Sequence, residues 1–382
     1  MSMEDSFGSK KVIAMVDVFC ERFGEDDIKK WVKAGGVPTR LRESLRKSDL
    51  WPYIASPALG GLDVGLVDRA AIIERCMRNT GAMMPIVSDM VSMALFSTFR
   101  PTSQGEIIEG LFDPSGVPCF SQAFTDGSAD PLAPARPTTV TIEGNGVCLN
   151  GEKAFVSGGQ FLPSMLVLAN DPVFGAADGG KSLWLFPSNV PGVETYPIDS
   201  IGQEMMSPAF VVFDRVNLDP EWRIQTDGKL GAMLDRQYHL GRLFICAACL
   251  GLAEAAYDDA LSYVSRHVVN GRVMGSLPQT QEKIVAMESR IRAMRWFVYD
   301  AASKSDSLSN PVEYALMKCV VPKASVEVAS TAMQLFGARG YSSQARIGRI
   351  WRDCRGCQLA QGTDELVTTL AARSILAECD RD

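Results

Sequence analysis

Side chains that could move a proton near neutral pH are scarce in this sequence. His239 and His267 are its only histidines, and histidine is the side chain best suited to proton transfer near pH 7. Tyr238 and Asp235 lie close to His239 along the chain, so these three residues are candidates for an acid. A lone histidine is, however, more often a core or solvated residue than a catalytic one. His239 therefore needs support from geometry before a role can be assigned to it.

Cysteines form a second group with chemical potential. The chain has 10 of them, and two pairs have the C-x-x-C spacing that four-cysteine zinc sites use, Cys246/Cys249 and Cys354/Cys357. Residues 244–252 around the first pair are a continuous apolar run, in which cysteine acts as a small hydrophobic side chain. A chain without a secretion signal keeps its thiols reduced. The sequence thus favours buried thiols over a metal site.

Charge and hydropathy exclude several classes of protein. The formal net charge of −7 argues against nucleic acid or an anionic membrane as the main partner. No apolar run approaches the roughly 20 residues that cross a bilayer, and residues 1–11 contain no apolar signal-peptide core. We expect a cytoplasmic chain that buries a large core and forms two or three domains.

The pattern of apolar residues divides the chain into three parts. Residues 1–117 and 223–382 carry apolar side chains at helical spacing. The helices predicted within residues 223–382 are long enough for a four-helix bundle. Residues 118–222 contain short β-branched and aromatic runs separated by Gly, Asn and Pro, which is typical of an antiparallel β domain. Asn145-Gly146 and Asn150-Gly151 are predicted to be tight turns. The helical segments are 12–23, 37–48, 67–80, 83–99, 230–268, 277–303, 310–336 and 364–379.

Several motifs in a consistent order resemble the acyl-CoA dehydrogenase family. They are Gly60-Gly-Leu-Asp63, Ala332-Met-Gln334, Arg346-Ile-Gly-Arg-Ile-Trp-Arg-Asp353 and Asp364-Glu365. Among the family's variants, the crotonobetainyl-CoA reductase type is the most similar. The resemblance implies an α+β fold with an N-terminal helical domain (1–117), a central β domain (118–222) and a C-terminal four-helix bundle (223–382). It also implies FAD as cofactor.

The resemblance assigns FAD contacts to three regions. Gln334-Leu-Phe-Gly-Ala-Arg-Gly340 is similar to the family's Gln-φ-φ-Gly-Gly-x-Gly, whose glycines let backbone N–H groups approach the pyrophosphate, although such a turn is also typical of a helix C-cap. Thr363 and Glu365 match positions near the ribityl chain and phosphate, and Thr363 equally suits a helix N-cap. The resemblance therefore assigns FAD contacts in the helical part to Gln334, Gly337, Ala338, Gly340, Thr363 and Glu365. In the β part it assigns them to Thr125, Phe155 and Ser157. Ser128 falls on the CoA side.

The positions that normally carry the catalytic base are empty. In the family's signature a Glu removes the acyl α-proton, and Gln361 occupies that place here, although a carboxamide cannot accept the proton. Family members without that Glu carry one directly before a helical Arg, which here is Gly241 before Arg242. Tyr238 and Arg242 are the expected substrate contacts. An FAD-binding Arg of the family is replaced by His267, with Arg266 next to it as a substitute.

Two classes of function follow from the resemblance. The first is a flavin-dependent acyl-CoA oxidoreductase, working as a 2-enoyl-CoA reductase or dehydrogenase that exchanges electrons with electron-transferring flavoprotein. Reduction tolerates the loss of the base because the α-proton can come from solvent. The second is a non-catalytic partner subunit of a mixed acyl-CoA dehydrogenase tetramer. Both classes predict association, as a homotetramer or with a homologous chain, and the retained Gln334 and Thr363 favour the first.

Overall fold

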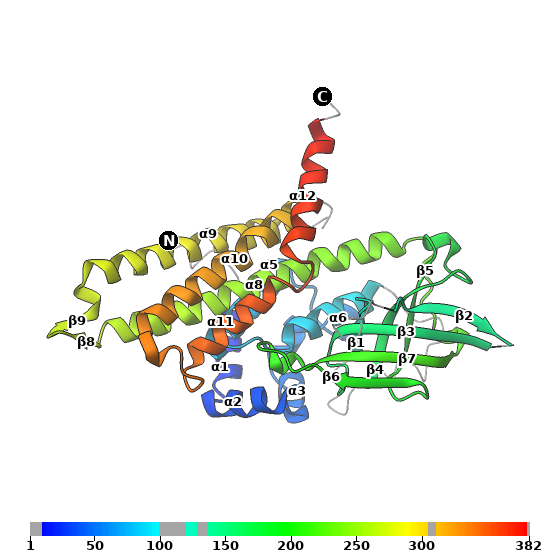
Figure 1. Ribbon diagram of the computed structural model, residues 1–382, viewed down its shortest axis with the longest axis horizontal. Helices are drawn as coiled ribbons and strands as arrows, with labels where there is room; N and C mark the ends of the chain where they lie inside the picture. Colours follow the sequence, from blue (N-terminus) through cyan, green and yellow to red (C-terminus); the bar gives the residue numbers. More distant parts are fainter. Residues whose placement is uncertain (1–9, 99–119, 128–135, 145, 305–310, 380–382) are drawn as a thin grey trace.

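The helices pack together in one part of the molecule, and a curled sheet forms the opposite end (Figure 1). The computed structural model describes residues 10–98, 120–127, 136–144, 146–304 and 311–379. The N-terminal helices are α1 (Lys10–Cys20), α2 (Glu25–Ala34), α3 (Thr39–Arg46), α4 (Trp51–Ile54), α5 (Leu66–Thr80) and α6 (Ile86–Thr98). The C-terminal helices are α8 (Leu230–Val264), α9 (Pro278–Ser303), α10 (Pro311–Phe336), α11 (Arg346–Cys357) and α12 (Asp364–Cys379). The predicted order of helices, sheet and helices is therefore confirmed.

The central sheet has the strand order β1-β4-β2-β3-β7-β6, with β5 paired to β4. Its strands are β1 (Phe120–Ala123), β2 (Thr139–Glu143), β3 (Gly146–Ser157), β4 (Ser164–Asn170), β5 (Lys181–Pro187), β6 (Val193–Pro197) and β7 (Pro208–Leu218). Pairing is antiparallel except at β4, which runs parallel to β1 and to the end of β2. Trp184 and Phe213 lie in the apolar core between the curled faces. The sheet is a rigid platform for the residues at its edges.

One predicted turn is a bulge. Asn150-Gly151 lies inside β3, where the register with β7 shifts between Leu149 and Gly151. Gly151 has a φ of 136°, and a Cβ at this position would lie 2.5 Å from the Cα of Thr138. The glycine thus lets the two backbones approach closely and bends the strand instead of reversing it. Asn145 of the other predicted turn lies outside the described residues.

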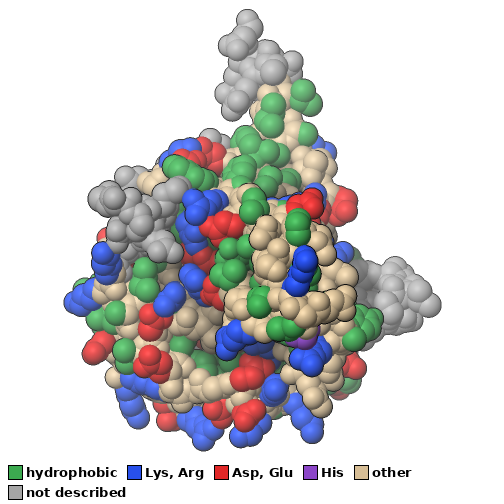
Figure 2. Space-filling view, turned by 90° about the vertical axis from the view of Figure 1, so that its left-hand side faces the viewer, with side chains coloured by type: hydrophobic (Ala, Val, Ile, Leu, Met, Phe, Trp, Pro, Cys, Tyr) green, Lys and Arg blue, Asp and Glu red, His purple; other side chains and the backbone are tan. Residues whose placement is uncertain are grey.

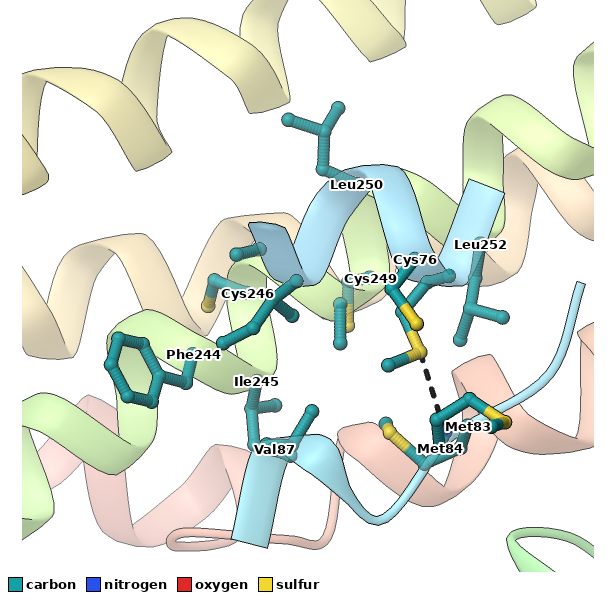
Figure 3. Packing of buried hydrophobic residues seen from close by; sticks show 14 of the residues in the cluster. Cys76, Met83, Met84, Val87, Phe244, Ile245, Cys246, Cys249, Leu250 and Leu252 are labelled. Carbon is teal, nitrogen blue, oxygen red and sulfur yellow. Dashed lines mark hydrogen bonds between the residues drawn. The ribbon is translucent and has the colours of Figure 1, made fainter. Parts of the chain in front are cut away.

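Helix α8 is the axis of the C-terminal bundle. It is long and apolar enough to cross a membrane, but 94% of its most apolar window is buried inside the protein, as expected for a core helix. Helices α5, α9, α10 and α11 pack around it. Figure 3 shows Ile245 of α8 beside Val87 of α6, in the same cluster of buried residues as Cys249 of α8 and as Met83 and Met84, which precede α6. The N-terminal helices and the bundle therefore share one core.

The residues of helix α11 were recognised as a sequence motif but were not predicted to be helical. Buried polar contacts explain where this helix lies. The carboxylate of Asp353 accepts backbone N–H groups of Met83 (2.8 Å) and Gln203 (2.6 Å). Burial raises the pKa of this carboxyl to about 6, although these two hydrogen bonds oppose the shift. Asp353 thereby joins α11 to the N-terminal helices and to the loop before β7. The turn that follows α11 is fixed by this framework.

Candidate functional site

The two base positions meet in space. A Cβ at Gly241 of α8 would lie 2.5 Å from Oε1 of Gln361, which follows α11. The end of the Gln361 side chain thus fills the space that a side chain at 241 would need, so any residue other than glycine at 241 would require this flexible end to move aside. Oε1 of Gln361 is buried and has no hydrogen-bond partner. At the position where the resemblance predicts a base, the structure thus has an amide whose oxygen has no protein partner.

Two buried cations hold the turn that carries Gln361. The ammonium of Lys318 in α10 donates to the carbonyl oxygens of Gln358 (3.3 Å) and Gly362 (3.1 Å). Nε of Arg242 donates to the carbonyl of Gln361 at 3.3 Å. Gln361 has a φ of 58°, a left-handed conformation that costs a non-glycine residue about 1–3 kcal/mol. The turn is therefore strongly determined by its surroundings.

Lys318 was not singled out from the sequence. Its side chain is fully buried in α10, in the apolar run 315–321. A signal existed, because lysine is almost never fully buried unless its charge is satisfied. The sequence alone could not show which carbonyls would satisfy it, since they lie 40 and 44 residues further along the chain.

Helix α8 separates the proposed acid His239 from the base position. Residues two apart on a helix point to different faces, whereas Tyr238 and Arg242 are four apart and share one face. The guanidinium of Arg242 lies 6.0 Å from the centre of the Tyr238 ring. His239 is buried and stacks on Tyr314 with ring centres 5.1 Å apart. The geometry brings Tyr238 and Arg242 together and leaves His239 as a packed side chain.

The β domain exposes an aromatic ring in an unusual conformation. Phe155 has a φ of 55° and is 66% exposed, and its ring lies 6.0 Å from that of Phe210. Positive φ is rare for a bulky residue and is often found at functional sites. Thr125 lies beside β3, because its carbonyl accepts the N–H of Ala154 at 3.0 Å. Ser157 ends β3, and Ser128 lies outside the described residues.

A hollow of about 530 Å³ lies where α8 and α10 end. The rings of His267, Tyr263 and Phe336 form a continuous stack, with centres 4.6 Å and 4.5 Å apart. Arg266 also lines the hollow, but its guanidinium donates to the hydroxyl and, at 3.2 Å, to the carbonyl of Ser262. Figure 2 looks onto this end of the molecule, where lysine and arginine side chains are numerous. Some of the N–H donors of Arg266 are therefore already bonded to Ser262, near the end of α8.

The glycine-rich motif divides between two surfaces. Phe336 faces the hollow just described, whereas exposed Gln334 lines a second hollow of about 340 Å³ between α9 and α10. Gly337, with a φ of 60°, lies just after the end of α10, and Ala338 is exposed. A Cβ at Gly340 would lie 2.8 Å from the carbonyl of Met333, so this residue is packed onto its own helix. The motif combines a helix end with an open surface.

Thr363 and Glu365 begin α12. The hydroxyl of Thr363 accepts the N–H of Leu366 at 3.4 Å, in the manner of an N-cap. Hydrogen bonds from its own backbone N–H and from Thr363 lower the pKa of Glu365, whose side chain is exposed. The capping interpretation of Thr363 is confirmed, and its role toward FAD stays a prediction.

The cysteines of the two C-x-x-C pairs come together in the bundle core. Cys249 lies next to Cys357, and Ser325 lies beside Cys249 and Cys354. The Ser325 hydroxyl donates to the carbonyl of Pro322 at 2.7 Å. All four thiols are fully buried. Within the described residues, no three His, Cys, Asp or Glu side chains are arranged to hold a metal ion. The thiols pack as small core side chains.

The residues predicted to contact a cofactor lie at two separate places. Phe155, whose ring is exposed, and Ser157 lie at the end of β3, whereas Arg266 and His267 line the hollow where α8 ends. Figure 1 shows the sheet at one end of the molecule and the β8–β9 hairpin (Val268–Val269 and Arg272–Val273), which follows His267, at the other. A single chain therefore keeps these two groups of residues apart (Figure 1).

Comparison with known proteins agrees with this architecture. Residues 232–376 match the acyl-CoA dehydrogenase C-terminal domain. The probable acyl-CoA dehydrogenase YdiO of Escherichia coli K12 is 32% identical over 265 residues, 69% of each chain. The crystal structure of an acyl-CoA dehydrogenase from Slackia heliotrinireducens is 31% identical with a TM-score of 0.86, covering 100% of this chain and 98% of the other. Butyryl-CoA dehydrogenase from Megasphaera elsdenii, at 21% identity over 96% and 97% of the two chains and a TM-score of 0.82, shares the fold. The chain belongs to the acyl-CoA dehydrogenase family.

Proposed function

We propose that this chain is an FAD-dependent acyl-CoA oxidoreductase that reduces a 2-enoyl-CoA better than it oxidises a saturated acyl-CoA. The observation that carries the proposal is the contact between Gln361 and Gly241, the two positions that supply a base in relatives. Neither can take an α-proton near neutral pH. Oxidation needs that step, whereas reduction needs a proton to be delivered.

Each residue has a defined part in this proposal. FAD, when bound, supplies hydride chemistry. The exposed ring of Phe155 and the hydroxyl of Ser157 would cover and orient the flavin at the edge of the sheet. Tyr238 and Arg242 would face the acyl group from α8, next to Gln361. The Gln361 amide would orient the thioester by donating a hydrogen bond, and solvent would supply the α-proton.

The partners follow from the family. Electron-transferring flavoprotein would exchange electrons with the flavin. A second copy of the chain, or a homologous one, would place its Arg266 and His267 hollow against the flavin bound at the first chain's sheet, giving a tetramer as in relatives. The crotonobetainyl-CoA reductase type remains the variant that the motifs favour. A cytoplasmic location is part of the same proposal.

A second function is favoured by the hollow at the end of α8. There the family's Arg is replaced by His267, which stacks on Tyr263, and Arg266 is bonded to Ser262. Weakened cofactor contacts together with a missing base are what a non-catalytic partner subunit would show. Such a chain would complete the FAD site of a homologous neighbour.

Two measurements test these alternatives. FAD per chain in the purified protein should be close to one for the enzyme and clearly lower for a partner subunit. Reduced protein mixed anaerobically with 2-enoyl-CoA thioesters should be reoxidised, and the oxidised protein should be bleached far more slowly by the matching saturated thioesters. FAD retention without a reaction in either direction, over a panel of acyl chains, would refute the enzyme. Low FAD retention together with the absence of any reaction would favour the partner subunit.

A further inference from the structure

Two buried cations beside position 361 lack a carboxylate partner. Lys318 is fully buried and Arg242 is 6% exposed. Within the described part of the chain neither forms an ion pair, and their hydrogen bonds to the turn all end on carbonyl oxygens of residues 358, 361 and 362. A buried charge normally requires an opposite charge or several hydrogen bonds. Here the carbonyl groups of one turn satisfy both cations.

The position of this turn explains why carbonyls suffice. Helix α11 ends at Cys357, so the carbonyls just beyond it lie at the negative end of the helix dipole. Lys318 bonds carbonyls on both sides of Gln361, and Arg242 bonds the carbonyl of Gln361 itself. Three bonds from two helices thus fix a residue whose φ of 58° is unfavourable. They determine where the side chain at 361 points.

The surrounding groups leave this region positively charged. Of the nearby acids, Asp364 is engaged by Lys323 (3.5 Å) and by the amide of Gln358 (3.1 Å), and Asp235 is exposed on α8. Burial raises the pKa of the Tyr238 hydroxyl and of the Cys246 thiol, so both are neutral near pH 7. Although burial opposes the shift, the charge of Lys318 helps to lower the pKa of the nearby Cys249 thiol. With a neutral amide at 361, no carboxylate of the described residues forms an ion pair with Lys318 or Arg242, and Asp235 acts on Arg242 only from the exposed face of α8.

We propose that Lys318, together with Arg242, is a positioning residue for position 361. The two cations also stabilise negative charge at this position, whether it is carried by the side chain of residue 361 or by the ligand. For the ligand, this inference rests on the proposed function: the group that reaches Gln361 would be a thioester whose oxygen gains negative charge during reaction. Lys318 would act through the carbonyls of the turn and would not touch the substrate. The two cations would retain the electrostatics of a site built for a carboxylate.

A double-mutant cycle on stability tests this without any activity. Gln361→Glu and Lys318→Gln are made singly and together, because glutamine at 318 keeps hydrogen-bond donors and removes the charge. The quantity compared is the change in the unfolding equilibrium constant that Gln361→Glu causes at about pH 7.5. This change should favour the folded state about tenfold more when Lys318 is present than when it is replaced by glutamine. A factor of ten is equivalent to about one pKa unit. Lys318→Arg keeps the charge and should keep most of the coupling. If Lys318→Gln does not fold, Arg242→Gln replaces it in the cycle.

A pH profile separates positioning from general stability. In Gln361→Glu, α-proton exchange of a bound acyl-CoA should depend on the ionised form of the carboxyl introduced at position 361. Loss of the Lys318 charge should then move the acidic limb of the profile upward by about one pH unit. Additive stability effects, with no coupling between 318 and 361, would overturn the inference. Coupled stabilities without exchange in any variant would support the inference and count against the proposed function instead.

Discussion

The turn at residues 358–363 and the hollow beside His267 both carry residues that the resemblance predicts to be functional, but they are built in different ways. The turn is held by Lys318 and Arg242, and Gln361 contacts Gly241 closely. The hollow is open, its volume is about 530 Å³, and its walls are a ring stack and an arginine bonded to its own helix. Under the proposed function, the first region lacks only the group that accepts a proton, and the second carries histidine in place of an arginine.

This difference indicates which loss is easier to reverse. In a fixed frame, one substitution can restore a missing group because its direction is already determined. In an open hollow, a new side chain must order itself, and neighbouring groups can compensate for it. We therefore expect large effects from changes at 241 and 361 and smaller ones at 267.

The largest effect should come from moving the base to the second position. Gly241→Glu alone would collide with Gln361, whose Oε1 lies 2.5 Å from the Cβ position, so it should destabilise the protein and give no activity. Gly241→Glu combined with Gln361→Gly frees the space and should raise α-proton exchange of an acyl-CoA by about 10²–10⁴-fold. Gly231→Glu on the exposed start of α8 is the matched control, since nothing lies within 4 Å of its Cβ position. Equal gains in the single and double variants would contradict the shared space.

The frame of the turn should depend on pH through Asp353. Its folded pKa of about 6 lies above the ordinary value of 3.8, so its stabilising contribution is complete below about pH 4 and is lost as the pH rises through 6. The loss is at most about 3 kcal/mol, from a difference of about two pKa units. Urea unfolding of the native chain and of Asp353→Asn from pH 4.5 to 7.5 measures it, because other titrations cancel in the difference. A difference that does not fall with rising pH would show that Asp353 ionises normally.

The hollow should respond more modestly to His267→Arg. A charge-assisted bond to an anionic phosphate contributes about 1.5–3 kcal/mol, less whatever Arg266 already supplies. We expect the affinity for FAD, measured as retention after dialysis, to rise by about tenfold. Arg266→Ala in both backgrounds serves as the control, and it should matter less once position 267 carries a guanidinium. Unchanged retention in His267→Arg alone would mean that Arg266 already supplies the contact. Unchanged retention in both His267→Arg and Arg266→Ala would mean that the cofactor phosphates do not reach this hollow from any chain.

The sequence predicted the elements with strong periodicity and missed those that depend on distant contacts. The long helices α8, α9 and α10 were evident from apolar spacing, and the change to β texture was clear. Helices α2 and α11 were missed because α2 is largely charged and α11 is placed by Asp353, whose partners Met83 and Gln203 lie far away in the chain. The importance of Gln361 came from a motif. Its contact with Gly241 and the role of Lys318 required the fold, since both involve residues about 40 or 120 positions apart.

The central claim is that this site lacks only its base, and α-proton exchange in deuterium oxide tests it most directly. The native chain and Gln361→Glu are loaded with FAD and incubated anaerobically with saturated acyl-CoA thioesters, and exchange is followed by mass spectrometry. The account predicts very slow exchange in the native chain and a gain of about 10²–10⁴-fold in the variant, because the side chain at 361 already points toward the substrate position. Rapid exchange in the native chain would reveal a base elsewhere, and the claim would be wrong.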